Sequence, residues 1–180
     1  MVTQYYTASS VDGFIADPDN SLSWLLSRDI DEHGPMGYAG VRAGWGAMCM
    51  GATTYQWIVD NHDDGWPYSM PCWVFTHRDF PPRDGDIRFT SAPIADVHAE
   101  MVAAAGGKNV WVVGGGDLVG QFHDAGLLDE VWVQYAPVTL GGGAPMLPRR
   151  IELRLTDLAQ NRDFACARYD VVRESATDGQ

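Results

Sequence analysis

The 180-residue chain has little positive charge, few cysteines and no long apolar segment. Lys and Arg total 12 against 24 Asp and Glu, which gives a formal net charge of −12 at pH 7. An acidic surface repels nucleic acids and anionic membranes, so neither is an expected partner. A few local arginines and backbone N–H groups can still bind an anionic cofactor.

The cysteines are too few and too widely spaced for a disulfide framework or a zinc site. Cys49, Cys72 and Cys166 form no C-x-x-C motif. Each lies in or beside an apolar, strand-like segment, so we expect buried free thiols. The five histidines form no H-x-x-x-H pair, and no metal site is expected.

Long apolar segments are also missing. No run approaches the roughly 18 apolar residues that a membrane span requires. The first residues, M-V-T-Q-Y, lack the basic and apolar regions of a secretory signal and are typical of a strand. We therefore expect a cytoplasmic protein.

Strand-like and helix-like segments alternate along most of the chain. The expected strands are 2–9, 47–50, 72–76, 87–90, 109–113 and 130–136, and the expected helices lie within 27–43, 53–59 and 94–105 and from 116 onward. A loop is expected at 11–24, and segments 151–158 and 164–172 predict a β-hairpin. The alternation predicts one α/β domain over 1–174 with a mainly parallel sheet, followed by a polar tail at 175–180.

The most informative stretch is a buried strand that runs through three glycines into a helix. An apolar run ends at Val113 and is followed by Gly114, Gly115 and Gly116. Asp117 can cap free N–H groups or lie favourably against the positive end of the helix dipole. The geometry suits a phosphate on a helix N-terminus, and it equally suits a tight turn with no ligand.

Two common nucleotide-binding signatures do not match this stretch. The Rossmann pattern G-x-G-x-x-G fails because its third glycine is Val119, and because the glycines follow a late strand. A P-loop fails because no suitably spaced glycine precedes Lys108, the single lysine.

Four ordered segments carry a resemblance to a known family. They are T-A-S-S-V-D-G-F-I-A at 7–16, M-G-A-T-T-Y at 50–55, V-V-G-G-G…Q-F at 112–122 and L-D-E-V…P-V-T-L-G-G-G at 128–143. Together they resemble the dihydrofolate reductase-like fold, in the branch typified by the C-terminal reductase domain of bacterial riboflavin-biosynthesis proteins. The resemblance spans about residues 2–172 and implies a three-layer α/β fold with helices on both faces of the sheet.

The resemblance implies an NADPH bound across the carboxyl ends of the parallel strands. Ala8 and Ile15 would flank the nicotinamide, and an unusual cis peptide bond is implied between Gly114 and Gly115. The implied cofactor-binding residues are Ala8, Ile15, Gly51, Ala52, Thr53, Thr54, Thr76, His77, Arg78, Val113, Gly114, Gly115, Gly116, Asp117, Leu118 and Val119.

One departure concerns the choice between NADPH and NADH. The family's usual arginine after the glycine of the second segment is Ala52 in this chain. Alanine cannot replace a bidentate contact from arginine to phosphate, which weakens the preference for NADPH unless Arg78 supplies the charge. Thr76, His77 and Arg78 would lie near the adenosine 2′-phosphate.

The resemblance also suggests residues for catalysis and for substrate binding. When Trp24 is aligned with the mobile-loop tryptophan of dihydrofolate reductases, Asp29 falls where their catalytic carboxylate belongs, and Asp31 and Glu32 lie close by. An acidic helix start is also typical of a solvated turn. Trp24 is expected at the mouth of the substrate pocket; Tyr135 is expected either in that pocket or in the core.

The implied function is an NADPH-dependent reductase resembling 5-amino-6-(5-phosphoribosylamino)uracil reductase of riboflavin biosynthesis. A dihydrofolate reductase and a non-catalytic nucleotide-binding module remain alternatives. The H-x-E…P-C-x-x-C signature of zinc deaminases does not occur in the chain. Arg28, Arg42, Arg149 and Arg150 are available for a substrate phosphate, and a homodimer is expected because it is common in this branch.

Overall fold

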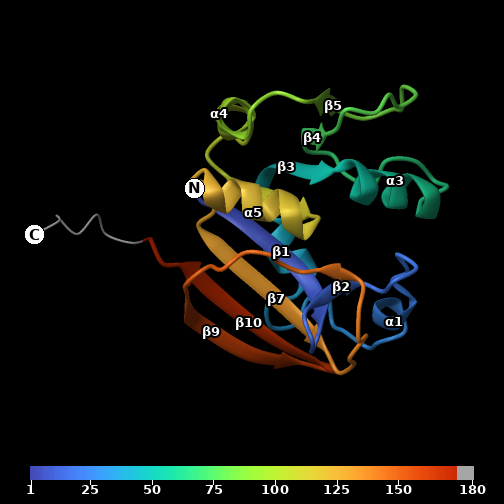
Figure 1. Cartoon of the computed structure of the whole chain (residues 1–180), viewed down its shortest axis with the longest axis vertical. Coiled ribbons are helices and arrows are strands. Elements are labelled where there is room, and N and C mark those ends of the chain that lie inside the picture. Colours follow the sequence, from blue (N-terminus) through green and yellow to red (C-terminus); the bar gives the residue numbers. More distant parts are fainter. Residues whose placement is uncertain (174–180) are drawn as a thin grey trace, which may run out of the picture.

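The computed structural model describes residues 1–173 as an eight-stranded sheet with helices on both faces (Figure 1). The strands lie in the order β5-β4-β3-β6-β1-β7-β10-β9. They are β1 (Thr3–Ser10), β3 (Trp45–Gly51), β4 (Cys72–Phe75), β5 (Ile87–Thr90), β6 (Asn109–Gly114), β7 (Glu130–Ala136), β9 (Leu153–Asn161) and β10 (Phe164–Val171).

The first six strands in this order, β5, β4, β3, β6, β1 and β7, run parallel to one another. Strand β10 is antiparallel to both β7 and β9. The expected parallel sheet with a C-terminal hairpin is therefore confirmed. The tail expected at 175–180 lies outside the described residues.

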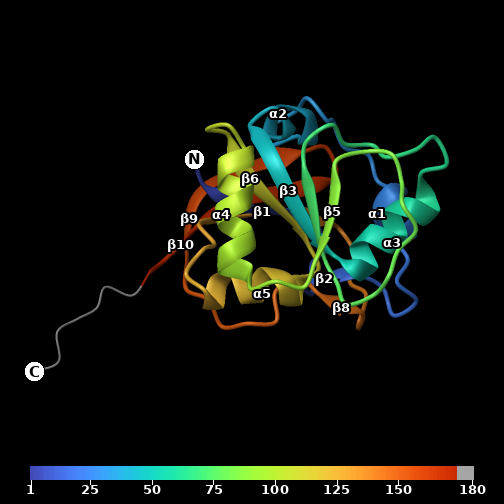
Figure 2. The same ribbon diagram turned by 90° about the horizontal axis from the view of Figure 1, so that it is seen from above.

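The helices are α1 (Ser23–Leu26), α2 (Tyr38–Arg42), α3 (Ala52–Asn61), α4 (Ile94–Ala104) and α5 (Gly116–Asp124). Val97 of α4 and Phe122 of α5 pack with Tyr5 on one face of the sheet, whereas Tyr55 of α3 packs with Tyr6 on the other (Figure 2). Neighbouring strand residues point to opposite faces, so both faces of β1 need an apolar cover. No helix among residues 1–173 is long and apolar enough to cross a membrane.

The helix expected within 27–43 forms, but it is short. Only α2 forms there, because Pro35 and several glycines disfavour a continuous helix. The side chain of Asn161 replaces helical bonds: it accepts a hydrogen bond from the Asp31 N–H at 3.1 Å and donates to the carbonyls of Asp31 and Pro35.

The loop expected at 11–24 contains a short strand that local sequence does not indicate. Strand β2 (Phe14–Ala16) pairs antiparallel with β8 (Ala144–Pro145) in a separate two-stranded sheet. Gly143 lies so close to Ala16 that a Cβ on it would overlap the Ala16 carbonyl. Gly143, the last of the three glycines at 141–143, therefore allows the two strands to approach each other closely.

Asp12 connects the turn before β2 to the segment that leads into β8. Its carboxylate accepts hydrogen bonds from the Ser10 hydroxyl at 2.6 Å, the Leu140 N–H at 3.0 Å and the Gly141 N–H at 2.7 Å. The Ser10 hydroxyl and then the two amides lower the pKa of this carboxyl from 3.8 to about 2.

All three cysteines are free and buried, as expected. Burial raises the pKa of the Cys49 and Cys72 thiols, so both stay protonated at neutral pH.

The Asp12 contacts predict an acid-dependent loss of stability. We expect Asp12→Ala to lower the melting temperature at pH 7, because the amides of Leu140 and Gly141 lose their acceptor. A depressed pKa of about 2 contributes stability above the ordinary value of 3.8, and this contribution is lost as the pH falls toward 2. The melting temperatures of wild type and variant, followed by circular dichroism, should therefore converge between pH 4 and 2.

Asp19→Ala is the matched control, because Asp19 lies in the same loop region and its carboxylate accepts no hydrogen bond from residues 1–173. Its melting temperature should follow the wild type at every pH. A gap between wild type and Asp12→Ala that persists undiminished at low pH would contradict the assignment.

Candidate functional site

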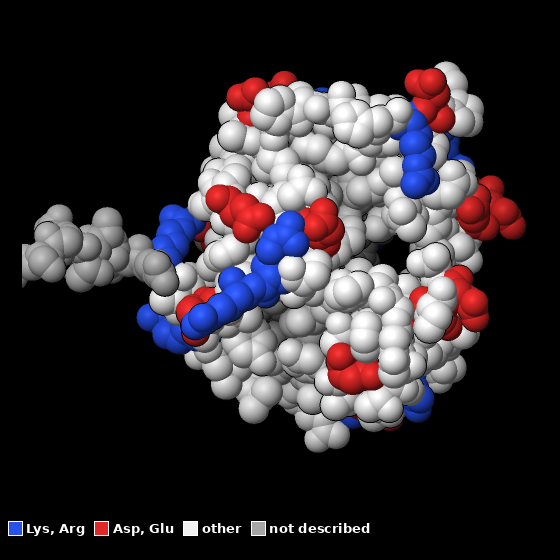
Figure 3. Space-filling model, viewed as in Figure 1, with Lys and Arg blue, Asp and Glu red and all other residues white. Residues whose placement is uncertain are grey.

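A cavity of about 1240 Å3 lies at the carboxyl ends of the parallel strands. Ala8 of β1, Gly51 of β3, Thr76 after β4 and Val113 of β6 all line it. Figure 3 shows the surface hollowed to the right of centre. The volume exceeds the roughly 300–1,000 Å3 of a typical small-ligand pocket, so the cavity has room for a large ligand.

Three helices begin at this edge of the sheet. Ala52 of α3, Ile94 of α4 and Gly116 of α5 belong to their first turns, and all three line the cavity. No side chain in the described part of the chain caps these helices. Their free N–H groups and positive dipole ends make the cavity attractive to anions although the protein is acidic.

Gly51 and Gly115 are the N-cap residues of α3 and α5, and folding alone does not explain either glycine. A Cβ on Gly51 would have no described atom closer than 3.9 Å, and one on Gly115 would have none within 4 Å. Their φ angles, −83° and −70°, suit any residue. By contrast, Gly114 has a φ of +130°, and a Cβ on Gly116 would overlap the Pro145 carbonyl. Gly51 and Gly115 therefore leave room for a ligand.

The two N-caps are neighbours because β3 and β6 pair in parallel, with Met50 opposite Gly114. The atoms closest to a Cβ on Gly51 would be the Gly114 carbonyl oxygen and the Gly115 nitrogen. The peptide bond between Gly114 and Gly115 is cis, which confirms the expectation.

Aromatic side chains form another part of the lining. Tyr6, Tyr38, Tyr68 and Trp111 all reach the cavity. The Arg42 guanidinium lies 5.8 Å from the ring centroid of Tyr38 and 5.9 Å from that of Tyr68. Burial raises the pKa of all three tyrosines, so their hydroxyls are protonated at neutral pH and offer hydrogen bonds without charge.

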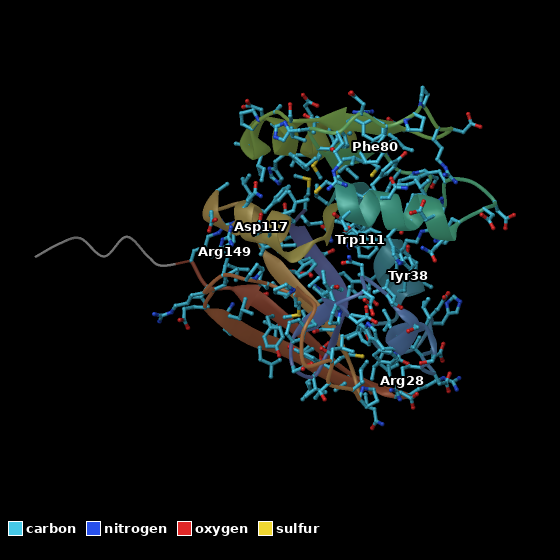
Figure 4. The ribbon with its side chains drawn as sticks, turned by 45° about the vertical axis from the view of Figure 1, so that its right-hand side comes forward. Arg28, Tyr38, Phe80, Trp111, Asp117 and Arg149 are labelled. Carbon is cyan, nitrogen blue, oxygen red and sulfur yellow. The ribbon has the colours of Figure 1, made fainter. Side chains whose placement is uncertain are left out.

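Carboxylates and guanidinium groups are rare in the lining. Among residues 1–173, Asp117 is the only carboxylate there and Arg28 the only guanidinium. Arg28 donates its Nε–H to the Trp24 carbonyl at 3.3 Å and forms no ion pair with the described residues. In Figure 4, Arg28 and Tyr38 lie on the opposite side of Trp111 from Asp117. Arg28 thus has donors available for an anionic ligand.

Most of the expected cofactor-binding residues come together here. Those that line the cavity are Ala8, Ile15, Gly51, Ala52, Thr53, Thr54, Thr76, His77, Val113, Gly115, Gly116, Asp117 and Leu118. Three others do not: Arg78 is exposed outside it, Gly114 is buried beneath it, and Val119 packs in the core below α5. Val119 points inward because it lies on the face of α5 that packs against the core, with Phe122 three positions later on the same face.

Asp29 lies away from the cavity. Its carboxylate forms an ion pair with Arg162 at 3.0 Å, and its own N–H donates to Asp163. Both contacts are to the turn between β9 and β10, and the Asp29 side chain is exposed to solvent there. This placement does not support Asp29 as the catalytic carboxylate.

Trp24 also lies outside the lining. Its side chain packs with Ala136, Phe164 and Cys166, and its indole N–H donates to the Ser21 carbonyl at 3.2 Å. A large apolar ring gains most by burial, so Trp24 anchors the segment while its neighbours, Arg28 among them, reach the cavity.

Tyr135 does not line the cavity. It packs against the cluster that includes Val131 and Val133, and burial raises its pKa to about 12. Its neighbour Gln134 lines the cavity instead, because side chains on β7 alternate. Tyr135 was expected either in the substrate pocket or in the core, and the structure places it in the core.

The same alternation could have identified two residues that sequence reasoning missed. Tyr6 lies two positions before Ala8, and Trp111 lies two positions before Val113, so each shares a face with a predicted site residue. Tyr38 and Tyr68 come from glycine- and proline-rich segments whose placement no local pattern predicts.

The sheet order, the cavity and the paired glycine N-caps define a domain with the dihydrofolate reductase-like fold. More particularly, the chain belongs to the RibD C-terminal domain family, whose model matches residues 3–166. This is the family of riboflavin-biosynthesis reductase domains, which generally use NADPH.

Known relatives agree with this assignment. The chain is 30% identical over 162 residues to protein YwjB of Bacillus subtilis (strain 168), whose function is uncharacterised; the match covers 88% of this chain and 91% of YwjB. A presumed riboflavin biosynthesis protein from Shewanella sp. PV-4 has a similar structure, with a TM-score of 0.81, 24% identity and coverage of 96% and 100%.

A second solved structure has the same fold at lower similarity. It is the diaminohydroxyphosphoribosylaminopyrimidine deaminase/5-amino-6-(5-phosphoribosylamino)uracil reductase of Thermotoga maritima, with a TM-score of 0.63 and 14% identity. The likeness covers 95% of this chain and 56% of that one.

The position of Asp29 predicts a small effect of Asp29→Asn. Because Asp29 and Arg162 are both more than half exposed, loss of their pairing should cost less than about 1 kcal/mol of unfolding free energy in urea. Any reductase activity of the wild type should stay within about twofold in Asp29→Asn, because the side chain does not reach the cavity. A turnover loss of tenfold or more with unchanged stability would restore the catalytic assignment.

Proposed function

We propose that this protein is an NADPH-dependent reductase that acts on 5-amino-6-(5-phosphoribosylamino)uracil or a closely similar pyrimidine. One observation carries the proposal: the adjacent N-caps Gly51 and Gly115 leave open space on a cavity where three helix N-termini converge. Family membership and the reductase named among the structural relatives support the same reaction type.

The residues present fit a dinucleotide. The N–H groups at the starts of α3 and α5 would bind its diphosphate, and Thr53 and Thr54 add hydroxyl donors. Ala8 and Ile15 offer small and apolar surfaces for a flat ring. When bound, NADPH supplies a hydride from its nicotinamide, and the protein supplies orientation and electrostatics.

A 2′-phosphate would have to be bound without the arginine that Ala52 replaces. His62 and His77 line the cavity, and Arg78 follows His77 on the exposed turn after β4. The Thr76 hydroxyl accepts the Arg78 N–H at 2.8 Å and orders this turn. We infer that this group takes the place of the missing arginine in the preference for NADPH.

The substrate part of the cavity favours a phosphorylated pyrimidine over a folate. Arg28 offers unpaired guanidinium donors, and Tyr38 and Tyr68 offer neutral hydroxyls. A folate reductase of the kind considered above needs a carboxylate at the pterin ring. Within residues 1–173 the one carboxylate in the lining is Asp117, which lies at the start of α5.

A homodimer and a cytoplasmic location stay predictions. For the homodimer, we propose that the second copy packs against β9, the edge strand of the sheet, where Leu155 and Leu158 are 52% and 66% exposed. An unpaired edge with exposed leucines favours association of two copies. A non-catalytic nucleotide-binding module remains the alternative to an enzyme, since Ala52 departs from the family pattern.

The first test of the proposal is cofactor binding. NADPH at 100 times its Kd should stabilise the wild type by about 2.7 kcal/mol, seen as a higher melting temperature. It should also quench fluorescence, because Trp57 and Trp111 line the cavity. Gly51→Ala should bind NADPH about tenfold more weakly or worse, because its methyl group occupies the space left for the ligand.

Gly40→Ala is the matched control. Gly40 is the exposed residue of helix α2, and a Cβ there would have no described atom within 4 Å. Both variants should fold with a stability within about 1 kcal/mol of wild type, and only Gly51→Ala should bind weakly. If neither NADPH nor NADH binds the wild type below millimolar concentration, the proposed function is wrong. Binding without turnover of any pyrimidine, pterin or carbonyl compound would favour the non-catalytic module.

Substrate recognition gives a separate test. Arg28→Ala should raise the KM for 5-amino-6-(5-phosphoribosylamino)uracil about tenfold or more, because a charge-assisted contact to phosphate is lost. The Kd for NADPH should not change. Arg162→Ala removes an arginine that lies outside the cavity and should leave both constants unchanged. An unchanged KM in Arg28→Ala would exclude Arg28 as the phosphate contact.

A further inference from the structure

Asp117 presents a difficulty for a site that binds a diphosphate. Its carboxylate is 67% exposed and belongs to the first turn of α5, where the free N–H groups face the cavity. A carboxylate in this position can accept hydrogen bonds from the free N–H groups of α5, and its negative charge repels an anionic ligand. Either effect would reduce binding of a diphosphate at α5.

The structure shows the carboxylate turned away from those N–H groups. No described side chain, Asp117 included, caps α5. Instead Asp117 accepts hydrogen bonds from the Gln121 amide at 2.9 Å and from the Arg149 guanidinium at 3.0 Å. These two contacts lower the pKa of the carboxyl below its ordinary value, so it is ionised at neutral pH and needs a compensating charge.

Arg149 is held across the outer surface of α5. Its Nε–H donates to Asp124 at 3.1 Å and its Nη1–H to the Pro148 carbonyl at 2.9 Å. Its side chain lies directly over Gly120, where a Cβ would come within 2.7 Å of the Arg149 Cγ. Figure 4 shows Arg149 beside Asp117. Arg149 itself does not line the cavity, so it reaches the site only through Asp117.

We propose that Arg149 is a positioning residue that keeps the N-terminus of α5 open to the cofactor diphosphate. It holds the Asp117 carboxylate away from the helix N–H groups and compensates its charge. Gly120 contributes to the same positioning, because a side chain at position 120 would prevent Arg149 from lying flat on α5. The inference rests on the proposed function, because it assumes that NADPH is the anion bound there.

A double-mutant cycle tests this role through the Kd for NADPH, measured by fluorescence titration. Arg149→Ala should bind NADPH about tenfold more weakly at low ionic strength, within the usual range of coupling between sites. In an Asp117→Asn background the same substitution should change the Kd by less than about twofold, because no charge remains to be compensated. Added salt should reduce the effect of Arg149→Ala, since exposed charges are screened.

Two further variants separate positioning from stability. Arg150→Ala is the matched control, because Arg150 is the next residue, is 92% exposed and pairs only with Glu152 among the described residues. Its Kd should equal that of the wild type. Gly120→Ala should reproduce the weaker binding of Arg149→Ala without any change of charge, because its Cβ displaces the Arg149 side chain. Thermal unfolding without ligand should show all variants folded.

A measurement without ligand checks the same positioning. In Arg149→Ala, the side-chain pKa of Asp117, followed by carbon NMR, should rise toward its ordinary value. Amide hydrogen exchange at Leu118 should slow, because the released carboxylate can cap the helix. An unchanged pKa of Asp117 would overturn the inference.

The outcomes distinguish the two proposals. Wild-type binding by Arg149→Ala would overturn this inference and leave the proposed function intact. Equal weakening in the Asp117→Asn background would also overturn it, because Arg149 would then act independently of Asp117. Absence of NADPH binding by the wild type would overturn the proposed function and the inference together.

Discussion

The parallel pairing of β3 with β6 is the constraint on which the candidate site depends. It places the ends of both strands at one edge of the sheet, so the N-caps of α3 and α5 become neighbours. Each cap is a glycine whose missing side chain faces open space, and the free N–H groups of two helices are directed to one region. A shift of one residue in this register would move the two glycines apart and turn the strand side chains to the wrong faces.

Backbone dipoles explain how a protein of net charge −12 can offer a site for anions. The cavity lining carries a single carboxylate and a single guanidinium among the described residues, so most of its attraction comes from helix N-termini. The carboxylate, Asp117, is paired with Arg149 on the outer surface of α5. Salt screens the repulsion of a ligand by acidic residues elsewhere beyond about 8–10 Å.

Much of the fold could be predicted because strand and helix periods are local. Strands at 87–90 and 130–136 coincide with β5 and β7, and the cysteines lie buried where apolar runs placed them. The local pattern also predicts the glycine-containing steps at Gly51 and Gly115, since glycine before a helix is a local signal. The extent of the helix expected within 27–43 could not be predicted. The side chain of Asn161, distant in sequence, holds the segment before α2, which proline and glycine keep out of a helix.

The sequence by itself determined the order of strands and helices, the glycine N-caps and the family to which the chain belongs, because short-range periodicity and motif spacing encode them. Only the tertiary structure decided which side chains meet. Tyr38 and Tyr68 reach the cavity from irregular segments, whereas Asp29 and Trp24 turn away from it. Successive side chains of β7 point to opposite faces of the sheet, and only the packed structure shows that Gln134 faces the site and Tyr135 faces the core. Contacts between distant segments depend on packing of the whole chain, which no local pattern contains.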